Sequence, residues 1–310
     1  MSRQTNQHGL SRYVPDPIAR QLRKECGFGC VVCGASVVDY HHIDPEFEDA
    51  KQHDPAKMAL LCGACHPKVT RHQWSKEKIK EARANPICLK RGFSSSSEWF
   101  DYGTEPPTII IGDITIYRPD YVLRMFGRNL LELKGAETPG GPVRISGWFY
   151  DGSDKLMSAV EDNCWKGPIE NWDIETIGPR ITIRRGPGDI ALVLRTEARK
   201  ALIIERLDMF YQGVRVYADK RGVYFGPPDK ELYGFQGEIV NPVCCIEVSK
   251  DDGREINSAV QIGVPTKASF TNNTICGAEL ALCIRGQGLI LGVGFRAIKV
   301  TGSLVKKCVE

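Results

Sequence analysis

From Thr108 onward, short runs rich in Ile, Val and Leu alternate with turns rich in Gly, Pro and Asp. Several of these runs place apolar and polar residues at every second position, which is typical of a strand with one buried face. Turn residues recur roughly every 8–12 residues, and almost none of the runs has helical spacing. Residues 108–310 are therefore predicted to form an all-β domain of about 200 residues.

Sandwich, barrel and solenoid architectures all fit such a pattern. The stretch from Trp172 to Met209 is regular, and the region lacks the hairpin dipeptide Asn-Gly. These two features favour a β-helix-like stack over a sandwich. We expect this domain to recruit, regulate or oligomerise the protein, through a protein partner or a second copy.

Residues 1–92 follow a different pattern. Helical spacing extends from Pro17 through Lys24. A second helix is predicted after Ser75, a suitable N-cap, with Ile79 facing the core. Residues 93–107 are rich in Ser, Gly and Pro, which predicts a linker or docking loop. The fold class is therefore α+β multidomain, with a small N-terminal domain, a linker and a larger β domain.

Composition is that of a folded protein, with 42% apolar and 25% charged residues. The formal net charge of +3 is too small to indicate nucleic-acid binding by itself. Its distribution is more informative, because residues 1–95 carry 15 Lys and Arg against 10 Asp and Glu. The rest of the chain carries 26 against 28. The positive charge is thus concentrated in the N-terminal part, which suits a polyanionic partner such as DNA.

The most basic segment of that part is the predicted second helix and the residues just before it. Its cations are Lys68, Arg71, Lys76, Lys78, Lys80 and Arg83. Two interpretations are open: a solvated helix face, or a surface that contacts phosphates beside an active site.

The chain has 12 cysteines, yet the sequence indicates a reducing compartment. The first residues, MSRQTNQHGLSRY, contain no apolar signal-peptide core, and no run approaches the roughly 18 apolar residues that span a bilayer. We therefore expect a cytoplasmic protein without a membrane partner. Scattered cysteines are expected to be reduced and buried: Cys88, Cys164, Cys244, Cys245, Cys276, Cys283 and Cys308.

Four other cysteines have the spacing of a structural zinc site. Cys30 and Cys33 form one Cys-x2-Cys pair, and Cys62 and Cys65 form a second. Two such pairs converging on one ion give a tetrahedral site that stabilises a small fold. Cys26 is an alternative ligand, but the two-residue spacing favours the other four.

Histidines surround these cysteine pairs, with His41 and His42 between them and His66 directly after the second. A zinc ribbon alone does not need them. Their positions predict a second metal site, of the kind used in nucleases.

The stretch CVVCG…DYHHIDP…HDPAKMALLCGACHPKVT resembles the HNH endonuclease family, in the branch of ββα-metal nucleases that has a four-cysteine zinc site. The resemblance covers about residues 26–85. The cysteine pairs, the His-His-Ile-x-Pro stretch and the Leu-Leu-Cys-x2-Cys-His ending occur in the family's order. It implies a ββα-metal fold that hydrolyses phosphodiester bonds with a divalent ion.

The resemblance also implies roles for single residues. His42 matches the family's general base, while His41 and His66 match positions that bind the catalytic ion, Mg²⁺ or a similar divalent cation. Asp39 lies two residues before His41, on the same side of a strand, so it is a further ligand or orients one. For each histidine the competing interpretation is a core or capping residue.

One position departs from the family pattern. The family has Asn five residues before the third zinc cysteine, and this chain has Lys57 there. A protonated lysine does not bind a metal ion. Either His53 or Asp54 substitutes, or the Asn only braces the loop and Lys57 contacts phosphate, as Lys68 and Arg71 are expected to do.

These observations predict a metal-dependent DNA endonuclease, which is a hydrolase. By analogy with the family, a role in bacterial or phage restriction or defence would suit it. The alternative is a zinc-dependent DNA-binding module whose HNH site no longer cuts. A third hypothesis is a nuclease for single strands or RNA.

Overall fold

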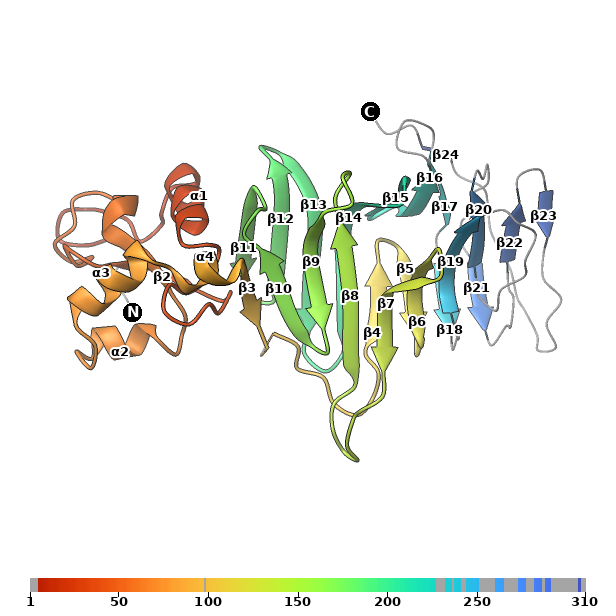
Figure 1. Cartoon of the computed structure of the whole chain (residues 1–310), viewed down its shortest axis with the longest axis horizontal. Helices are drawn as coiled ribbons and strands as arrows, with labels where there is room; N and C mark the ends of the chain where they lie inside the picture. The colour runs from red at the N-terminus through yellow and green to blue at the C-terminus, as the bar shows by residue number, and fades with distance from the viewer. Residues whose placement is uncertain are drawn as a thin grey trace. The chain divides into compact units, whose positions relative to one another are not determined.

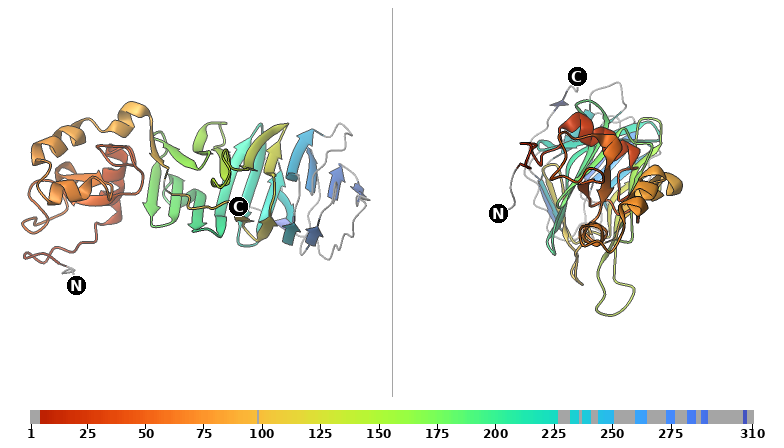
Figure 2. Two further views of the ribbon diagram at one scale, coloured as in Figure 1. Left: turned by 90° about the horizontal axis from the view of Figure 1, so that it is seen from below. Right: turned by 90° about the vertical axis from the view of Figure 1, so that its left-hand side faces the viewer.

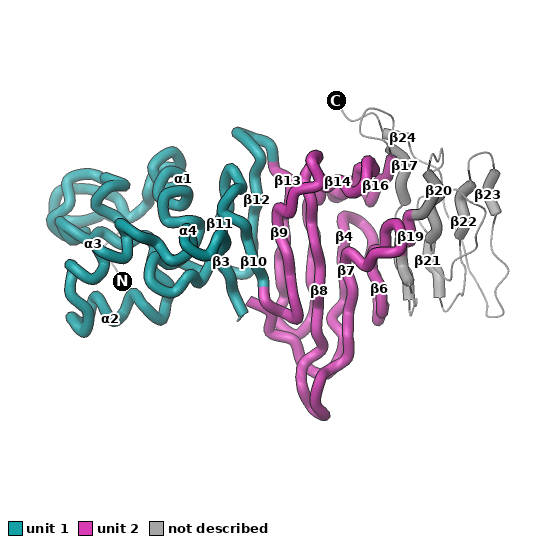
Figure 3. The backbone as a smooth tube through the Cα atoms, in the orientation of Figure 1, with its two compact units in different colours: residues 1–97, 165–189 teal, residues 98–164, 190–310 magenta. Residues whose placement is uncertain are grey.

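The computed structural model describes residues 5–97, 99–226, 232–235, 237–240, 244–250, 260–264, 273–276, 282–285, 288–290 and 306–307, with side chains beyond 226 only at 246–248. The described chain is mostly β, with few helices (Figure 1). It divides into two compact units (Figure 3): residues 1–97 with 165–189, and residues 98–164 with 190–310. Within the described part, every helix is too short or too polar to cross a membrane.

Unit 1 contains the helices. They are α1 (Asp16–Glu25), the 3-10 helix η1 (Pro55–Lys57), α2 (His66–Thr70), α3 (Lys76–Ala84) and α4 (Ile87–Arg91). Its strands are β1 (Asp39–His42), β2 (Met58–Leu61), β3 (Phe93–Ser96), β10 (Cys164–Pro168), β11 (Asp173–Ile177) and β12 (Arg180–Gly186). The pairs β1–β2, β3–β10 and β11–β12 are antiparallel.

The helices of unit 1 form where the sequence indicates. α1 buries Ala19 and Leu22 on one face, as its helical spacing predicts. α3 begins at its predicted cap, because the Ser75 hydroxyl accepts the backbone N–H of Lys78 at 3.2 Å. Ile79 of α3 is fully buried in the core beneath the fully buried strand β2. This core holds the β1–β2 pair in place.

The predicted linker at 93–107 is wrong at its start. Phe93–Ser96 form strand β3, which pairs with β10 in the register Ser96 to Trp165. The serines that resemble a linker alternate between buried and half-buried positions. A run of serines can also form a strand when its backbone N–H and C=O groups pair with another strand. Here the partner strand lies about 70 residues further along the chain. Unit 1 is therefore built from two separate chain segments.

A buried ionic network attaches α1 to β11. The Arg23 guanidinium donates to both carboxylate oxygens of Asp173, at 2.9 and 2.7 Å, and to the Tyr40 hydroxyl at 2.7 Å. Arg184 donates to Asp173 at 3.0 Å and to Glu175 at 2.8 Å. Because Tyr40 belongs to β1, the network also braces the strand that carries His41 and His42.

Asp173→Asn is expected to destabilise unit 1 by about 3 kcal/mol, because it leaves the buried Arg23 charge without its main partner. Asp189→Asn is the matched control. Its carboxylate pairs with Arg185 on the surface, where such pairs contribute roughly 0–1 kcal/mol. Urea unfolding of the full chain measures both. Equal losses for the two variants would show that the Arg23 network has no special role.

Unit 2 consists of strands. They are β4 (Thr108–Ile111), β5 (Ile114–Tyr117), β6 (Tyr121–Met125), β7 (Arg128–Lys134), β8 (Arg144–Tyr150), β9 (Leu156–Glu161), β13 (Asp189–Glu197), β14 (Ala201–Tyr211), β15 (Val214–Asp219), β16 (Gly222–Gly226), β17 (Leu232–Phe235), β18 (Gly237–Val240), β19 (Cys244–Lys250), β20 (Val260–Val264), β21 (Asn273–Cys276), β22 (Leu282–Arg285), β23 (Gly288–Ile290) and β24 (Lys306–Lys307). Figure 2 shows these strands from two further directions.

Two meanders run through the described part of unit 2. β6 to β9 pair in chain order, as do β13 to β17, and every one of these pairs is antiparallel. Parallel pairs join β4 to β14, β5 to β18 and β6 to β19. The predicted all-β character is confirmed, whereas the β-helix-like stack is not confirmed, because a meander folds back at each turn instead of coiling.

The turns explain why the hairpins are not evident in the sequence. Phe126 and Gly127 connect β6 to β7 with φ of 50° and 79°, and Gln212 and Gly213 connect β14 to β15 with 47° and 78°. Two successive positive φ values are typical of the type I′ hairpin turn, which usually has Asn at its first central position. Phe126 and Gln212 adopt that conformation without being residues that predict it.

Two of the scattered cysteines have described side chains, and only one of the two is buried as expected. Cys88 is buried, Cys164 is half-buried, and neither forms a disulfide. The expected buried side chains of Cys244, Cys245, Cys276, Cys283 and Cys308 lie outside the described residues.

Candidate active site and metal centres

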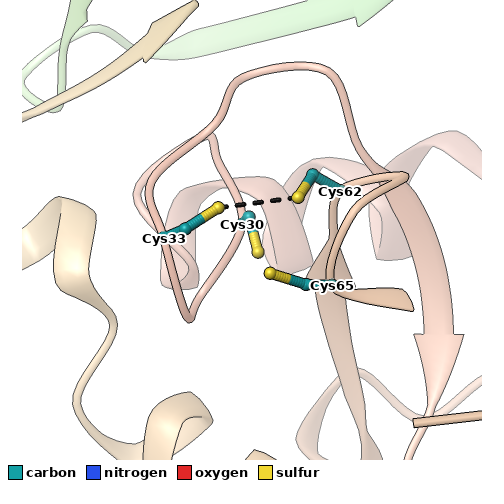
Figure 4. Close-up of side chains that lie close together, drawn as sticks. All are labelled: Cys30, Cys33, Cys62 and Cys65. Atoms are coloured by element: carbon teal, nitrogen blue, oxygen red, sulfur yellow. Dashed lines mark hydrogen bonds between the residues drawn. The ribbon is translucent and has the colours of Figure 1, made fainter. Parts of the chain in front are cut away.

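The four predicted zinc cysteines come together at one point of unit 1 (Figure 4). Cys30 and Cys33 lie in the loop after α1, Cys62 follows β2, and Cys65 precedes α2. All four Sγ atoms lie within 4.8 Å of one another. Four sulfurs bound to one zinc ion would be separated by about 3.8 Å, so small side-chain rotations suffice to ligate it. The cluster can therefore hold a metal ion and is compatible with structural zinc.

Backbone turns bring each pair of thiols together. The Gly34 N–H donates to the Cys30 carbonyl at 2.8 Å, and the Cys65 N–H donates to the Cys62 carbonyl at 3.0 Å. Gly34 has φ of 86°, a conformation that strongly favours glycine. These turns are encoded locally, which is why the cysteine spacing alone is sufficient to predict the cluster.

The thiols differ in acidity. A hydrogen bond from the Cys33 thiol lowers the pKa of the Cys30 thiol, which favours the thiolate form that binds a metal ion. Burial raises the pKa of Cys65 to about 12 and that of Cys26 to about 11. Cys26 lies in the hydrophobic core. Among the described residues, it does not belong to the group of cysteines that could hold a metal ion.

A second constellation lies along β1. Because adjacent residues of a strand point to opposite faces, Asp39 and His41 share one face and His42 takes the other. His41 Nδ1 lies 3.2 Å from Nε2 of His66, the first residue of α2. Two nitrogens that bind one divalent ion are about 3 Å apart, so this pair is suitably placed to hold a catalytic ion.

The sequence leaves two roles open for Asp39, metal ligand or orienting residue, and its position is compatible with the second. Its carboxylate lies 3.4 Å from Nδ1 of His66, on the ring nitrogen opposite the one that faces His41. A carboxylate on the second nitrogen of a ligating histidine fixes the orientation of the ring and raises its basicity. Within the described residues, only the four cysteines form a group of three or more metal-binding side chains.

His42 contacts a different partner. Its Nε2 lies 3.2 Å from Nδ1 of His53, and both rings are buried. Burial lowers the pKa of His42 to about 4, and the neighbouring His53 and Arg12 add to this effect. Burial and the adjacent His66 also lower the pKa of His41 to about 4. Both rings are therefore neutral near pH 7, as a metal ligand and a general base must be.

The three histidines His41, His42 and His66 line one groove of 440 Å³. Its wall also includes residues that the sequence did not single out: Arg12, Glu46, Phe47, His72 and Trp74. The Arg12 guanidinium lies over the Phe47 ring at 4.4 Å. No sequence spacing connects Arg12 with the later residues, because they meet only through tertiary packing.

The predicted phosphate contacts lie in different places. Lys68 is exposed and lies over the Trp74 ring at 4.8 Å, with Lys78 on the same ring at 4.0 Å. Arg71 is exposed at the end of α2. Lys57 belongs to a second cavity of 430 Å³, whose wall also includes His42.

Neither suggested substitute for the family Asn reaches the His41–His66 pair. His53 is bonded to His42, and the Asp54 side chain accepts the backbone N–H of Ala56 at 3.0 Å as the cap of η1. Lys57 pairs with Asp54 at 3.9 Å, and its side chain is 58% exposed. Of the two alternatives that the sequence leaves open, these contacts favour the one in which the family Asn only braces the loop.

Comparison of the chain with protein-family models, with curated proteins and with solved structures gives no match. Functional inference therefore depends on the residues and geometry of unit 1.

Proposed function

We propose that unit 1 is a metal-dependent DNA endonuclease of the HNH type. The observation that carries the proposal is the His41–His66 pair, with ring nitrogens 3.2 Å apart, in the same groove as the neutral His42. The order of the antiparallel strands β1 and β2, followed by α2, is compatible with the ββα arrangement that the sequence resemblance implies, and it supports the proposal. The cysteine cluster at the ends of β2 and α2 would bind zinc as the scaffold.

In the proposed reaction, His42 accepts a proton from a water molecule in the groove. The water oxygen forms the new bond to phosphorus, and the bond from phosphorus to the leaving oxygen breaks. Asp39 keeps the His66 ring in its ligating orientation. A divalent ion bound by His41 and His66 would neutralise charge on the phosphate and on the leaving oxygen.

The substrate class follows from charge and from the surroundings of the groove. Arg12 and Lys76 line it, and Lys68 and Lys78 flank Trp74 at its margin. Within the groove, Arg12 pairs with Glu48 at 3.9 Å and Lys76 pairs with Glu46 at 2.9 Å. The phosphate-contacting interpretation of the basic segment therefore rests on Lys68 and Lys78 beside Trp74. The unbridged thiols of Cys26 and Cys88 support the proposed cytoplasmic location.

For unit 2 we propose a recruiting or regulatory role. Its parallel pairs support a stacked arrangement in the C-terminal part, because β5, β18 and β21 pair in parallel, as do β6, β19, β20 and β22. The recruiting role is tested by a pull-down that uses the full chain as bait. A deletion of residues 98–164 is less suitable, because it would remove β4 to β9 and leave only part of unit 2.

Cleavage assays with zinc-loaded full-length protein test the nuclease proposal. Supercoiled plasmid, single-stranded DNA and RNA are incubated in parallel with Mg²⁺ or Mn²⁺. We expect nicked or linear plasmid that disappears with EDTA. Binding of plasmid without cleavage of any substrate would favour the non-cutting zinc module, and cleavage of only RNA or single strands would replace DNA duplex as the substrate.

Lys57→Ala is expected to weaken DNA binding several-fold at 0.1 M salt and to lower the salt slope by about one, because one phosphate contact is lost. Lys90→Ala, an exposed change on α4, is the control. Filter binding over a salt series measures both. If Lys57→Asn instead raises the cleavage rate about tenfold, the result would show that Lys57 obstructs the metal site and contacts no phosphate.

A further inference from the structure

His53 is a buried polar residue that the proposed cleavage reaction does not yet use. It is 8% exposed and lies between two partners: its Nδ1 is 3.2 Å from His42 Nε2, and its Nε2 is 2.9 Å from the Ser11 carbonyl oxygen. A buried ring with a partner on each nitrogen has its protons assigned by what those partners can donate or accept.

The Ser11 carbonyl determines the direction of the chain of hydrogen bonds. A carbonyl oxygen only accepts, so His53 Nε2 must carry its proton and donate it. Neutral His53 then has a bare Nδ1, which must accept from His42. His42 Nε2 therefore carries the proton, and neutral His42 is left with a bare Nδ1. Among the described residues, none forms a hydrogen bond to that nitrogen.

The Ser11 carbonyl is itself held in place. The Asn6 side-chain amide donates to the carbonyls of Phe47 and Ala50, each at 2.6 Å, and its oxygen accepts the Leu10 N–H at 2.9 Å. These bonds fasten the N-terminal segment to the loop that carries His53. The segment that leads to Ser11 is thus anchored close to His53, and the Ser11 carbonyl ends the hydrogen-bonded series His42–His53–Ser11.

We propose that His53 is a positioning residue, which holds His42 in the Nε2-protonated tautomer so that Nδ1 is the atom that accepts the proton during cleavage. The inference rests on the proposed nuclease function for its consequence, although the tautomer exists whether or not the protein cuts. When Nδ1 takes up a proton, the His42 Nε2–H donates more strongly to His53, and this stabilises the charged ring.

NMR of the zinc-loaded full chain with ¹⁵N-labelled histidine tests the tautomer directly. Two-bond and three-bond ring correlations near pH 7.5 distinguish a proton on Nε2 from one on Nδ1, and His42→Ala identifies the His42 signals. We expect wild-type His42 to carry its proton on Nε2. A proton on Nδ1 would overturn the proposal. This readout does not depend on cleavage, so failure of the nuclease proposal would be seen separately, in the plasmid assay.

Two variants then separate positioning from packing. His53→Leu keeps apolar bulk but removes the acceptor, and it should lower kcat about 10- to 100-fold with little change in KM. His53→Asn places an amide oxygen near the position of Nδ1 and should recover much of the loss. Equal loss in both variants at equal zinc content would assign His53 a packing role. If His53→Leu fails to fold, the wild-type tautomer and the kcat of His53→Asn still decide.

Discussion

His42→Ala is expected to slow phosphodiester cleavage by about 10²–10⁴-fold, the usual contribution of a positioned general base. The loss should appear in the single-turnover rate, because alanine removes the proposed proton acceptor from the groove. DNA affinity should change little, since the buried His42 ring makes no expected phosphate contact.

The control for this variant is His8→Ala. His8 is exposed and outside the groove, so its replacement tests whether loss of any histidine reduces activity. Zinc content is measured for both variants, because the cleavage rates are comparable only when the scaffold is intact. A His42→Ala protein that cuts at the wild-type rate, with full zinc content, would remove His42 from the mechanism.

Cys62→Ala is expected to abolish zinc binding and to unfold the β1–β2–α2 region. Structural zinc in small modules contributes about 10–16 kcal/mol of binding free energy, which is comparable to or larger than the whole stability of a typical domain. The small core of this region cannot compensate for that loss. We expect zinc near one ion per chain in the wild type, almost none in the variant, and rapid proteolysis within residues 26–85.

Cys88→Ala is the matched control, because Cys88 is equally buried but lies outside the cluster. It should retain zinc and resist proteolysis. Chelation of zinc from the wild type should reproduce the Cys62→Ala result and should be reversed by added zinc. A zinc-free protein with an unchanged near-UV circular dichroism spectrum would mean that the cysteines merely pack.

The cysteine cluster could be predicted from sequence because its geometry is local. Each Cys-x2-Cys pair is closed by its own backbone turn, so the spacing alone brings two thiols together. The alternation of β1 similarly predicts that Asp39 and His41 share a face. Helix α3 followed from its Ser75 cap and the apolar Ile79, both short-range signals.

What the sequence did not indicate depends on contacts between distant residues. The sequence suggests His53 only as a metal ligand, since nothing in it shows that the Ser11 carbonyl lies against one of the His53 ring nitrogens. The serine run of β3 resembles a linker in the sequence because its partner β10 lies far along the chain. The buried Arg23–Asp173 pair joins residues 150 positions apart. Pairing over such distances leaves no local pattern.

The central claim is that the His41–His66 pair holds the ion that supports cleavage, separately from the cysteine site. The most direct test is the rate of plasmid nicking as a function of Mn²⁺ concentration, for the wild type and for His66→Ala at equal zinc content. We predict saturable activation of the wild type and, in the variant, a midpoint raised more than about tenfold or no cleavage at all. Superimposable curves, or a wild type that cuts at no Mn²⁺ concentration, would contradict the claim.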